Sequence, residues 1–316
     1  MREEHLGRDT AGIWTAAQAR QAGLSDDEVY GRLERGCWQS PHRGVYADAG
    51  VLLSPPMRGW AAVLAGGGPG RAWATGRTAL RMFELPLIDD DDPATGAYDR
   101  VHDDVLVRGS RRDRATLHPT RRHVSDDQLG RIATCPSVSL RAAVMQSTSV
   151  ISAESLVCVI DAALHRGLLT QADLEMLAVE QAGRPGVDVL RGAVACADGR
   201  AESPLETLGR LALRELLPGL VPQVRVRDRT GRELARVDLG DEALRLAVEG
   251  DGRGTHQGMA AEDHRRDRKI GHEGWHTERY TWFEVRRQRA AMQRRIVAAA
   301  ALRQQHLRQQ PSPQPP

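Results

Sequence analysis

The feature that most constrains the fold of this chain is an apolar-faced hairpin pattern in its C-terminal third. It reads Arg236-Val-Asp-Leu-Gly-Asp-Glu-Ala-Leu-Arg-Leu-Ala-Val-Glu-Gly-Asp-Gly252. Val237 and Leu239 alternate with polar neighbours before the polar break at 240–242. After the break, the large apolar residues Leu244, Leu246 and Val248 alternate with Arg245, Ala247 and Glu249. A period of two on both sides of a turn predicts two antiparallel strands with one apolar face.

The polar face of this hairpin carries three carboxylates, Asp238, Glu249 and Asp251. A turn over 241–244 would set Asp238 opposite Ala247, with Glu249 as its diagonal neighbour roughly 7–8 Å away. Carboxylates gathered in this way repel one another unless a cation lies among them, and hard oxygen ligands suit Mg²⁺. The alternative is an acidic outer face that serves solubility alone. The alternation by itself leaves both interpretations open.

The composition limits the class of protein. A chain of 316 residues suggests roughly two or three domains. No stretch approaches the ~18 apolar residues of a membrane span, and the start Met-Arg-Glu-Glu-His lacks an apolar signal core. The four cysteines form no Cys-x-x-Cys pair, which argues against a zinc site and for reduced thiols in the cytoplasm. They are Cys37, Cys135, Cys158 and Cys196.

The charge distribution is more informative than the net charge of +2. Residues 253–308 contain thirteen Lys or Arg and six Asp or Glu, a local excess of seven. A basic segment after an acidic hairpin would suit an anionic polymer held over a metal. A solvated helix face would look the same. Lys269 is the only lysine of the chain and follows the carboxylates closely.

Residues 1–48 are predicted to form a small winged-helix module. Thr15 can cap a helix that ends at Ala22, and Ser25-Asp-Asp-Glu28 is a capping box for a second helix that ends at Arg35. Residues 37–39 and 44–47 then flank 40–43 as a hairpin. Helix, turn, helix and hairpin is the winged-helix order, in which the second helix enters the major groove of DNA.

The charges of this module give mixed indications about DNA. The second helix begins with Asp26, Asp27 and Glu28, where base contacts usually start. Basic residues near the end of this helix and in the hairpin could nevertheless reach phosphates. These are Arg32, Arg35 and Arg43. A protein partner is therefore an open alternative to DNA for this module.

Residues 49–198 are predicted to connect and position the two ends of the chain. Short strands are expected at 105–108 and 115–118. Beyond Pro136, apolar residues at helical spacing predict helices at 138–145, 155–164 and 171–179, so the region is mixed and then mostly helical. Asp161 and His165 lie one helical turn apart and could bind a ligand. A cap or salt bridge near Gly167 is the favoured interpretation.

Residues 199–303 are predicted to form an α/β unit, a mixed sheet flanked by helices. Ser203-Pro-Leu-Glu206 is a strong helix start, with the N-cap, the first-turn proline and the capping glutamate in place. A strand begins near Val224 and leads into the hairpin. A polar helix over 260–273, a strand over 275–282 and a long basic helix over 284–303 then follow. The long helix is expected to turn Val285, Met292 and Ile296 inward. The tail, 304–316, is expected to be disordered.

The order of these elements and their acidic residues resembles the PD-(D/E)XK nuclease core. More narrowly, residues 201–300 are similar to the uncharacterised endonuclease domain related to very-short-patch-repair endonucleases. Residues 12–47 resemble the N-terminal winged helix of AbiEi-type antitoxins. The strings that carry the nuclease resemblance are Ala201-Glu-Ser-Pro-Leu-Glu206, Arg236-Val-Asp-Leu239, Leu246-Ala-Val-Glu-Gly-Asp-Gly252, Arg265-Arg-Asp-Arg268 and Gly274-Trp275.

The resemblance implies a site with assigned roles. Asp238 and Glu249 would be ligands of Mg²⁺ or Mn²⁺, and Glu206, with Glu202 as second choice, would orient the metal-bound water. Asp251 stands where the general nuclease pattern has lysine. The missing positive charge would then come from the following helix, with a nearby histidine assisting or contacting phosphate. These further residues are Lys269, Arg265 as the fallback, and His256.

Three functions follow from these patterns. The first is a metal-dependent DNA endonuclease with an N-terminal DNA-binding module. The second is an antitoxin-like transcriptional regulator whose nuclease-like domain only binds DNA or a toxin-like protein partner. The third is a scaffold for protein interactions, which the acidic start of the second helix supports.

Overall fold

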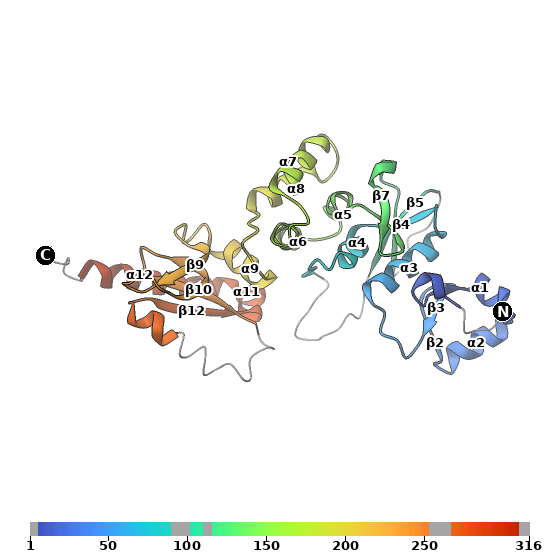
Figure 1. Ribbon diagram of the computed structural model, residues 1–316, viewed down its shortest axis with the longest axis horizontal. Coiled ribbons are helices and arrows are strands. Elements are labelled where there is room, and N and C mark those ends of the chain that lie inside the picture. The colour runs from blue at the N-terminus through green and yellow to red at the C-terminus, as the bar shows by residue number, and fades with distance from the viewer. Residues whose placement is uncertain (1–5, 90–101, 110–115, 253–266, 310–316) are drawn as a thin grey trace. The chain divides into compact units, whose positions relative to one another are not determined.

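The computed structural model is a mixed α/β protein with three sheets, and it describes residues 6–89, 102–109, 116–252 and 267–309 (Figure 1). The chain divides into two compact units. Unit 1 comprises residues 1–160 and 169–195, and unit 2 comprises 161–168 and 196–316. The helix α6, Ala153–His165, contributes residues to both units. None of the described helices is both long and apolar enough to cross a bilayer.

The N-terminal module has the predicted order of helix, helix and hairpin. Both helices begin with complete capping boxes, at Thr15 with Gln18 and at Ser25 with Glu28. A short strand that was not predicted joins the hairpin, so the sheet order is β1-β3-β2. The elements are a 3-10 helix at Arg8–Thr10, β1 (Trp14–Thr15), α1 (Ala16–Gln21), α2 (Asp26–Glu34), β2 (Trp38–His42) and β3 (Val45–Asp48).

Two apolar clusters hold this module in place. One lies inside it, where the Trp14 and Trp38 rings meet edge to face with centroids 4.9 Å apart. The other is shared with the rest of unit 1. Ile13, Val45 and Ala47 belong to the same core cluster as Trp60 and the strands of the second sheet. Residues 1–48 are therefore part of a larger hydrophobic unit.

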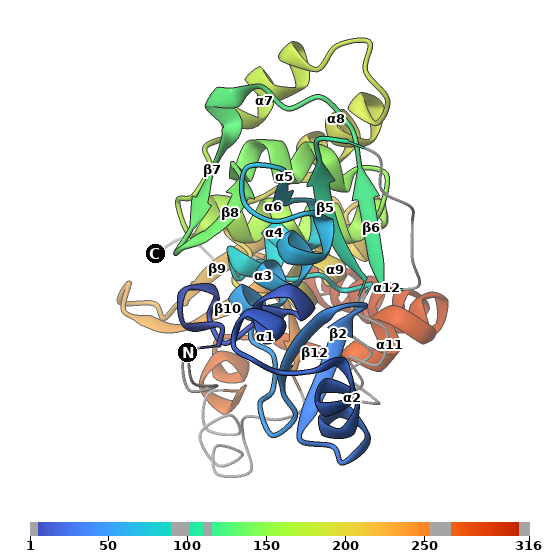
Figure 2. The same ribbon diagram turned by 90° about the vertical axis from the view of Figure 1, so that its right-hand side faces the viewer.

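The second sheet of unit 1 has the strand order β6-β5-β4-β8-β7, and Figure 2 shows β7, β8, β5 and β6 side by side. The sequence predicted only the two strands near 105–108 and 115–118. The others, such as Ala72-Trp-Ala74, are too short to show an alternation. The elements are α3 (Pro55–Gly66), β4 (Ala72–Ala74), α4 (Gly76–Met82), β5 (Asp103–Val107), β6 (Leu117–Thr120), a 3-10 helix at Asp126–Gln128, β7 (Leu129–Ile132), β8 (Cys135–Val138) and α5 (Leu140–Ser147).

A buried charge cluster ties the β2–β3 hairpin, the wing of the N-terminal module, to this sheet. The Asp103 carboxylate on β5 is 0% exposed, and its Oδ2 lies 3.1 Å from His42 Nε2 on β2. Arg58 of α3 donates to both Asp103 oxygens, at 3.2 and 2.8 Å. His42 Nδ1 also lies 3.2 Å from the Thr116 hydroxyl. A buried charge is tolerated only when it is paired and hydrogen-bonded, so these contacts fix the position of β2.

The predicted helices beyond Pro136 are confirmed. The segments 138–145, 155–164 and 171–179 correspond to α5, α6 and α7, and a further helix, α8, was not predicted. The bounds of the last two are Gln171–Glu180 for α7 and Val187–Cys196 for α8.

Unit 2 contains a four-stranded mixed sheet with the order β12-β11-β10-β9 (Figure 1). Strands β9, β10 and β11 pair antiparallel with one another in turn, whereas β12 pairs parallel with β11. Helix α9 contacts β10, β11, α11 and α12. The elements are α9 (Pro204–Leu213), β9 (Val221–Arg227), β10 (Glu233–Asp241), β11 (Leu246–Asp251), β12 (His276–Thr281), α11 (Trp282–Arg287) and α12 (Arg289–Gln309).

The C-terminal helix differs from the prediction in two ways. The single helix expected over 284–303 is interrupted at Gln288, where φ is −130° and ψ is 30°. The second piece then continues to Gln309, past the predicted start of a disordered tail at 304. The expected inward residues are confirmed, because Val285, Met292 and Ile296 are all at most 1% exposed.

The register of the central hairpin corrects the prediction. The ladder pairs Asp241 with Leu246, Gly240 with Ala247 and Leu239 with Val248, so its continuation places Asp238 opposite Glu249. The turn occupies 242–245 because Asp241 Oδ1 accepts the Leu244 N–H at 2.9 Å and Arg245 adopts a left-handed φ of 48°. Loop length and turn geometry set the register, and these are not visible in the alternation.

Candidate active site

Glu206 is held at the start of α9 by three hydrogen bonds. The Ser203 hydroxyl donates to its Oε1 at 2.8 Å, and the Glu202 N–H and the Gln223 amide donate to its Oε2 at 2.9 and 2.8 Å. The Ser203 side chain in turn accepts the Glu206 N–H. The predicted capping function is present, although Glu206 reaches the N–H of Glu202 instead of the N-cap residue. The carboxylate is thereby fixed toward β9.

A row of polar residues crosses the sheet of unit 2. The β9–β10 ladder pairs Pro222 with Leu239 and Val224 with Val237, which sets Gln223 opposite Asp238. The hairpin continues the row from Asp238 to Glu249. The parallel pair of strands completes it with Arg279. Since directly opposed residues share a face of the sheet, this polar row brings Asp238 and Glu249 closer together than the predicted diagonal would have done.

Glu249 is the most buried carboxylate of the row, at 7% exposure. The Arg279 guanidinium lies 3.4 Å from its Oε2 and 2.8 Å from Asp267 Oδ1. The Arg279 guanidinium thus contacts both Glu249 and Asp267, and its contact with Asp267 is the shorter one. A buried carboxylate requires compensating positive charge, and at this position that charge comes from β12.

Gly250 aligns the hairpin and allows close packing behind it. Its N–H donates to Asp238 Oδ2 at 2.9 Å. A Cβ at this position would lie 2.8 Å from Leu205 Cγ and 3.3 Å from the Tyr280 hydroxyl oxygen. The glycine inside the Glu-x-Asp string is therefore required by the packing of α9 against β11.

The Tyr280 hydroxyl lies at the centre of this packing. It is 0% exposed and donates to the Leu205 carbonyl at 3.0 Å. Burial raises the pKa of Tyr280 well above its ordinary value, and the nearby charges of Asp238 and Glu206 raise this pKa further. The Tyr280 hydroxyl is thus within electrostatic range of one carboxylate from α9 and one from β10.

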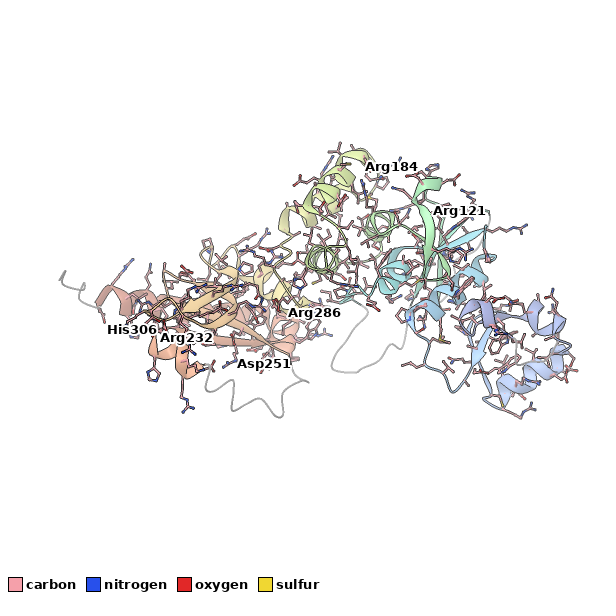
Figure 3. The ribbon with its side chains drawn as sticks, in the orientation of Figure 1. Arg121, Arg184, Arg232, Asp251, Arg286 and His306 are labelled. Atoms are coloured by element: carbon pink, nitrogen blue, oxygen red, sulfur yellow. The ribbon has the colours of Figure 1, made fainter. Side chains whose placement is uncertain are left out.

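Two of the predicted residues lie at the surface. Asp251 is exposed at the end of β11, as Figure 3 shows. Lys269 is also exposed, and it makes no hydrogen bond or ion pair within the described residues. The cation found beside Glu249 is Arg279, and a role for Lys269 stays a prediction. His256 and Arg265 lie outside the described residues.

A buried ion pair behind the site positions α9. Asp161 is 1% exposed, and its Oδ2 accepts from Arg210 at 2.6 Å and from the Thr207 hydroxyl at 2.8 Å. Its Oδ1 accepts the Asp198 N–H at 2.7 Å. Asp161 therefore has the structural role that was favoured for it, and His165 contacts the Gly199 carbonyl instead.

The three arginines proposed for DNA contact differ in their surroundings. Arg32 is half-buried, with its guanidinium 5.4 Å from the centre of the Trp38 ring. Arg35 is exposed at the C-terminal end of α2, and Arg43 is exposed in the turn between β2 and β3. The acidic start of α2 is used internally, because Glu28 completes the capping box and Asp26 pairs with Arg20.

Three residues of the site were not found by sequence reasoning, namely Gln223, Arg279 and Tyr280. Gln223 has a left-handed φ of 58°, which is unusual for a residue with a side chain. It occupies a regular polar position in the alternation of β9, between the buried Pro222 and Val224, so no local signal separates it from Arg225 and Arg227. Arg279 and Tyr280 lie in β12, whose sequence is mostly polar. Nothing in that sequence indicated that β12 pairs with the strand that carries Glu249.

Asp238 and Glu249 have the chemistry to hold a divalent cation. Mg²⁺ in proteins is usually held by one or two carboxylates, with water and substrate phosphate as the remaining ligands. Asp238 and Glu249 supply such a pair of hard oxygen ligands on neighbouring strands. A carboxylate can accept about four bonds, so the Gly250 N–H leaves capacity on Asp238. Within the described ranges, however, no group of three or more His, Cys, Asp or Glu side chains is arranged to hold a metal.

Two curated relatives resemble part of this chain. No protein-family model matches the chain. It is 31% identical over 173 residues to the uncharacterized proteins MT2308 of Mycobacterium tuberculosis strain CDC 1551 / Oshkosh and Rv2248 of strain ATCC 25618 / H37Rv. The matched region covers 53% of this chain and 61% of each relative. The chain thus spans about three fifths of the length of the curated relatives it matches, and it is similar to them over that part.

Proposed function

We propose that the protein is a metal-dependent DNA endonuclease whose N-terminal module contacts DNA. The observation that carries this proposal is the polar row of unit 2, in which Asp238 and Glu249 are opposed across the hairpin beside Glu206. The order of helix, three antiparallel strands and a parallel fourth strand also agrees with the resemblance to PD-(D/E)XK nucleases. A cytoplasmic location accords with this function.

Asp238, Glu249 and Arg279 of the row, and Glu206 beside it, would each have a distinct part in hydrolysis. Asp238 and Glu249 would hold Mg²⁺ or Mn²⁺, which when bound lowers the pKa of water and neutralises charge developing on phosphorus. Glu206, fixed by Ser203, Glu202 and Gln223, would orient the attacking water. Arg279 would balance the charge of Glu249 and hold a phosphate oxygen by a charge-assisted hydrogen bond.

The test is cleavage of supercoiled plasmid DNA by the full chain with Mg²⁺ or Mn²⁺. Asp238→Asn and Glu249→Gln remove a ligand charge and should each abolish cutting while the circular dichroism spectrum is unchanged. Glu242→Gln is the matched control, because Glu242 is exposed in the turn of the same hairpin. Cutting by Asp238→Asn at the wild-type rate, or no cutting by the wild type with either metal, would contradict the proposal.

A second candidate is an antitoxin-like regulator that binds DNA without cutting it, with a toxin-like protein as its partner. It is favoured by the intramolecular hydrogen bonds that Glu206 and Asp238 accept, because these bonds use part of the capacity of both carboxylates to bind a metal or water. Its test is a gel shift against the DNA upstream of the protein's own gene. Arg35→Glu and Arg43→Glu should weaken such binding, whereas Arg191→Glu, an exposed change on α8, should not. Equal binding by all three variants would exclude the N-terminal module as the DNA reader.

A further inference from the structure

Unit 1 contains a cavity of about 100 Å³ that is separate from the carboxylates of unit 2. Its inner wall is formed at the end of β4, by β5 and by α5, and its outer rim by residues around the end of β6. The rim residues are half-buried or exposed, so the cavity opens to solvent on that side. The lining residues are Thr75, Gly76, Asp104, His118, Thr120, Arg122, Gln146, Ser149 and Val150.

Thr75 presents a hydroxyl that the fold does not use. It occupies the N-cap position of α4 but makes no capping hydrogen bond. Asp104 caps the helix in its place, with Oδ2 accepting the Arg77 N–H at 2.8 Å while the Arg77 guanidinium holds both carboxylate oxygens. Thr75 is 1% exposed, and its Oγ1 has no hydrogen-bond partner among the described residues.

Gln146, which lines the same cavity, has an amide oxygen without a hydrogen-bond partner among the described residues. The residue is 8% exposed on α5, and this Oε1 is buried. The next residue, Ser147, shows the usual arrangement, with its hydroxyl donating to the Ala143 carbonyl at 2.8 Å. Buried polar atoms in native proteins nearly always have a hydrogen-bond partner, which is protein or ordered water. Thr75 and Gln146 line one cavity and each has a buried oxygen without a protein partner among the described residues, so a molecule bound there can supply the missing hydrogen bonds.

The chemistry of these groups defines that ligand. A glutamine amide carries an acceptor and a donor side by side, and it pairs with an edge that offers the complementary donor and acceptor, as glutamine does with nucleobases. A cavity of roughly 150 Å³ holds one benzene ring, so about 100 Å³ admits a single six-membered ring with part of it left at the rim. Arg122 and His118 line the cavity and could contact an anionic group there.

We propose that this cavity binds a pyrimidine base, with Gln146 and Thr75 reading its hydrogen-bonding edge. The same edge is present on a free base or nucleoside and on a base turned out of a nucleic acid strand. The inference does not depend on hydrolysis in unit 2, because none of the lining residues belongs to that unit.

The experiment is a calorimetric titration of the full chain with uracil, cytosine and thymidine, and with single-stranded oligodeoxythymidylate and oligodeoxycytidylate. We expect at least one probe to bind, and Gln146→Leu to weaken that binding by about tenfold or more. Gln171→Leu, the same change at an exposed position on α7, should bind like the wild type. Binding of the strands alone would identify a strand as the source of the base, and binding of the small probes would identify the free compound.

The inference fails if none of the five probes binds, or if Gln146→Leu binds them as tightly as the wild type. A structural role for the amide would instead lower the melting temperature of Gln146→Leu. Thr75→Val is then decisive, because it removes only the unused hydroxyl. It should keep the melting temperature and weaken binding, whereas Thr78→Val should lower the melting temperature, because the Thr78 hydroxyl accepts the Asp104 N–H at 2.7 Å. Unchanged binding by Thr75→Val would overturn the proposal.

Discussion

The backbone N–H of Gly250 and the carboxylate of Asp238 are joined by a 2.9 Å hydrogen bond across the hairpin of unit 2. This contact aligns the strand that carries Glu249 with the strand that carries Asp238. It coincides with the position where a side chain would collide with Leu205. Glycine at this point therefore maintains the spacing of the two carboxylates and does not weaken it.

Gly250→Ala should lower the free energy of unfolding by about 1–3 kcal/mol, because the new methyl group overlaps the Leu205 side chain. Gly252→Ala is the control, since no described atom lies within 4 Å of a Cβ there, and it should change stability by no more than about 0.5 kcal/mol. Urea unfolding measures both. Adding Leu205→Ala should make the cost of Gly250→Ala smaller, and fully additive costs would contradict the overlap.

The raised pKa of Tyr280 predicts a loss of stability in alkali. In the folded protein the phenol stays neutral above its ordinary pKa of about 10, whereas in the unfolded chain it ionises there. The contribution of Tyr280 to the free energy of unfolding is therefore complete below about pH 10. It is lost as the pH rises above that value, by up to about 1.4 kcal/mol per pH unit. Tyr280→Phe should remove this component. Parallel curves of unfolding free energy against pH for the two proteins would refute the prediction.

The buried ion pair between Asp161 and Arg210 should be costly to break. Asp161→Ala leaves the Arg210 charge without its carboxylate and should cost about 3–5 kcal/mol. Asp188→Ala breaks the surface ion pair between Asp188 and Arg191, in which the Asp188 side chain is 91% exposed. It should cost less than about 1 kcal/mol. Thermal and urea unfolding distinguish the two. Equal costs would mean that Asp161 does not anchor α9.

His42 should stabilise unit 1 although it belongs to the wing. His42→Ala removes the contacts to Asp103 and Thr116 and should lower the free energy of unfolding by about 1–3 kcal/mol. Arg43→Ala changes the adjacent, exposed residue and should have little effect. The measurement is urea unfolding monitored by tryptophan fluorescence. A stable His42→Ala protein would show that the wing is held by apolar contacts alone.

The four thiols should react in two classes. Cys135 and Cys158 are buried, and burial raises the pKa of Cys135 to about 12. Both should resist a disulfide reagent at pH 8, because the thiolate is the reacting species. Cys37 is exposed and Cys196 is half-buried, so both should react in the native protein. Titration of thiols before and after unfolding counts each class, and rapid reaction of all four in the native state would be inconsistent with the structure.

The sequence was sufficient where a local pattern determines the structure. The capping residues Thr15, Ser25 and Ser203 begin helices as predicted, because a cap needs only neighbouring atoms. The alternation from Arg236 to Asp251 correctly predicted two strands with a turn between them. The same alternation gave no information on register, which depends on the Asp241 side chain and the left-handed Arg245.

The other features depend on contacts between distant segments. Arg279 reaches Glu249 only because β12 returns parallel to β11. Gln223 reaches Glu206 because the first turn of α9 lies beside β9, and no local pattern encodes either arrangement. The five-stranded sheet of unit 1 was largely missed because strands of three or four residues carry no measurable period. The cavity with Thr75 and Gln146 likewise joins residues from separate elements.

The contact between His42 and Asp103 also limits how this protein can be taken apart. Excising residues 1–48 would remove His42 from a fully buried carboxylate and would strip Ile13, Val45 and Ala47 from a shared core. The remaining fragment would be a damaged protein, and activity lost with the N-terminal module would include the effect of that damage. The N-terminal module and the sheet beside it should therefore be inherited, expressed and lost together, as one indivisible piece of the chain.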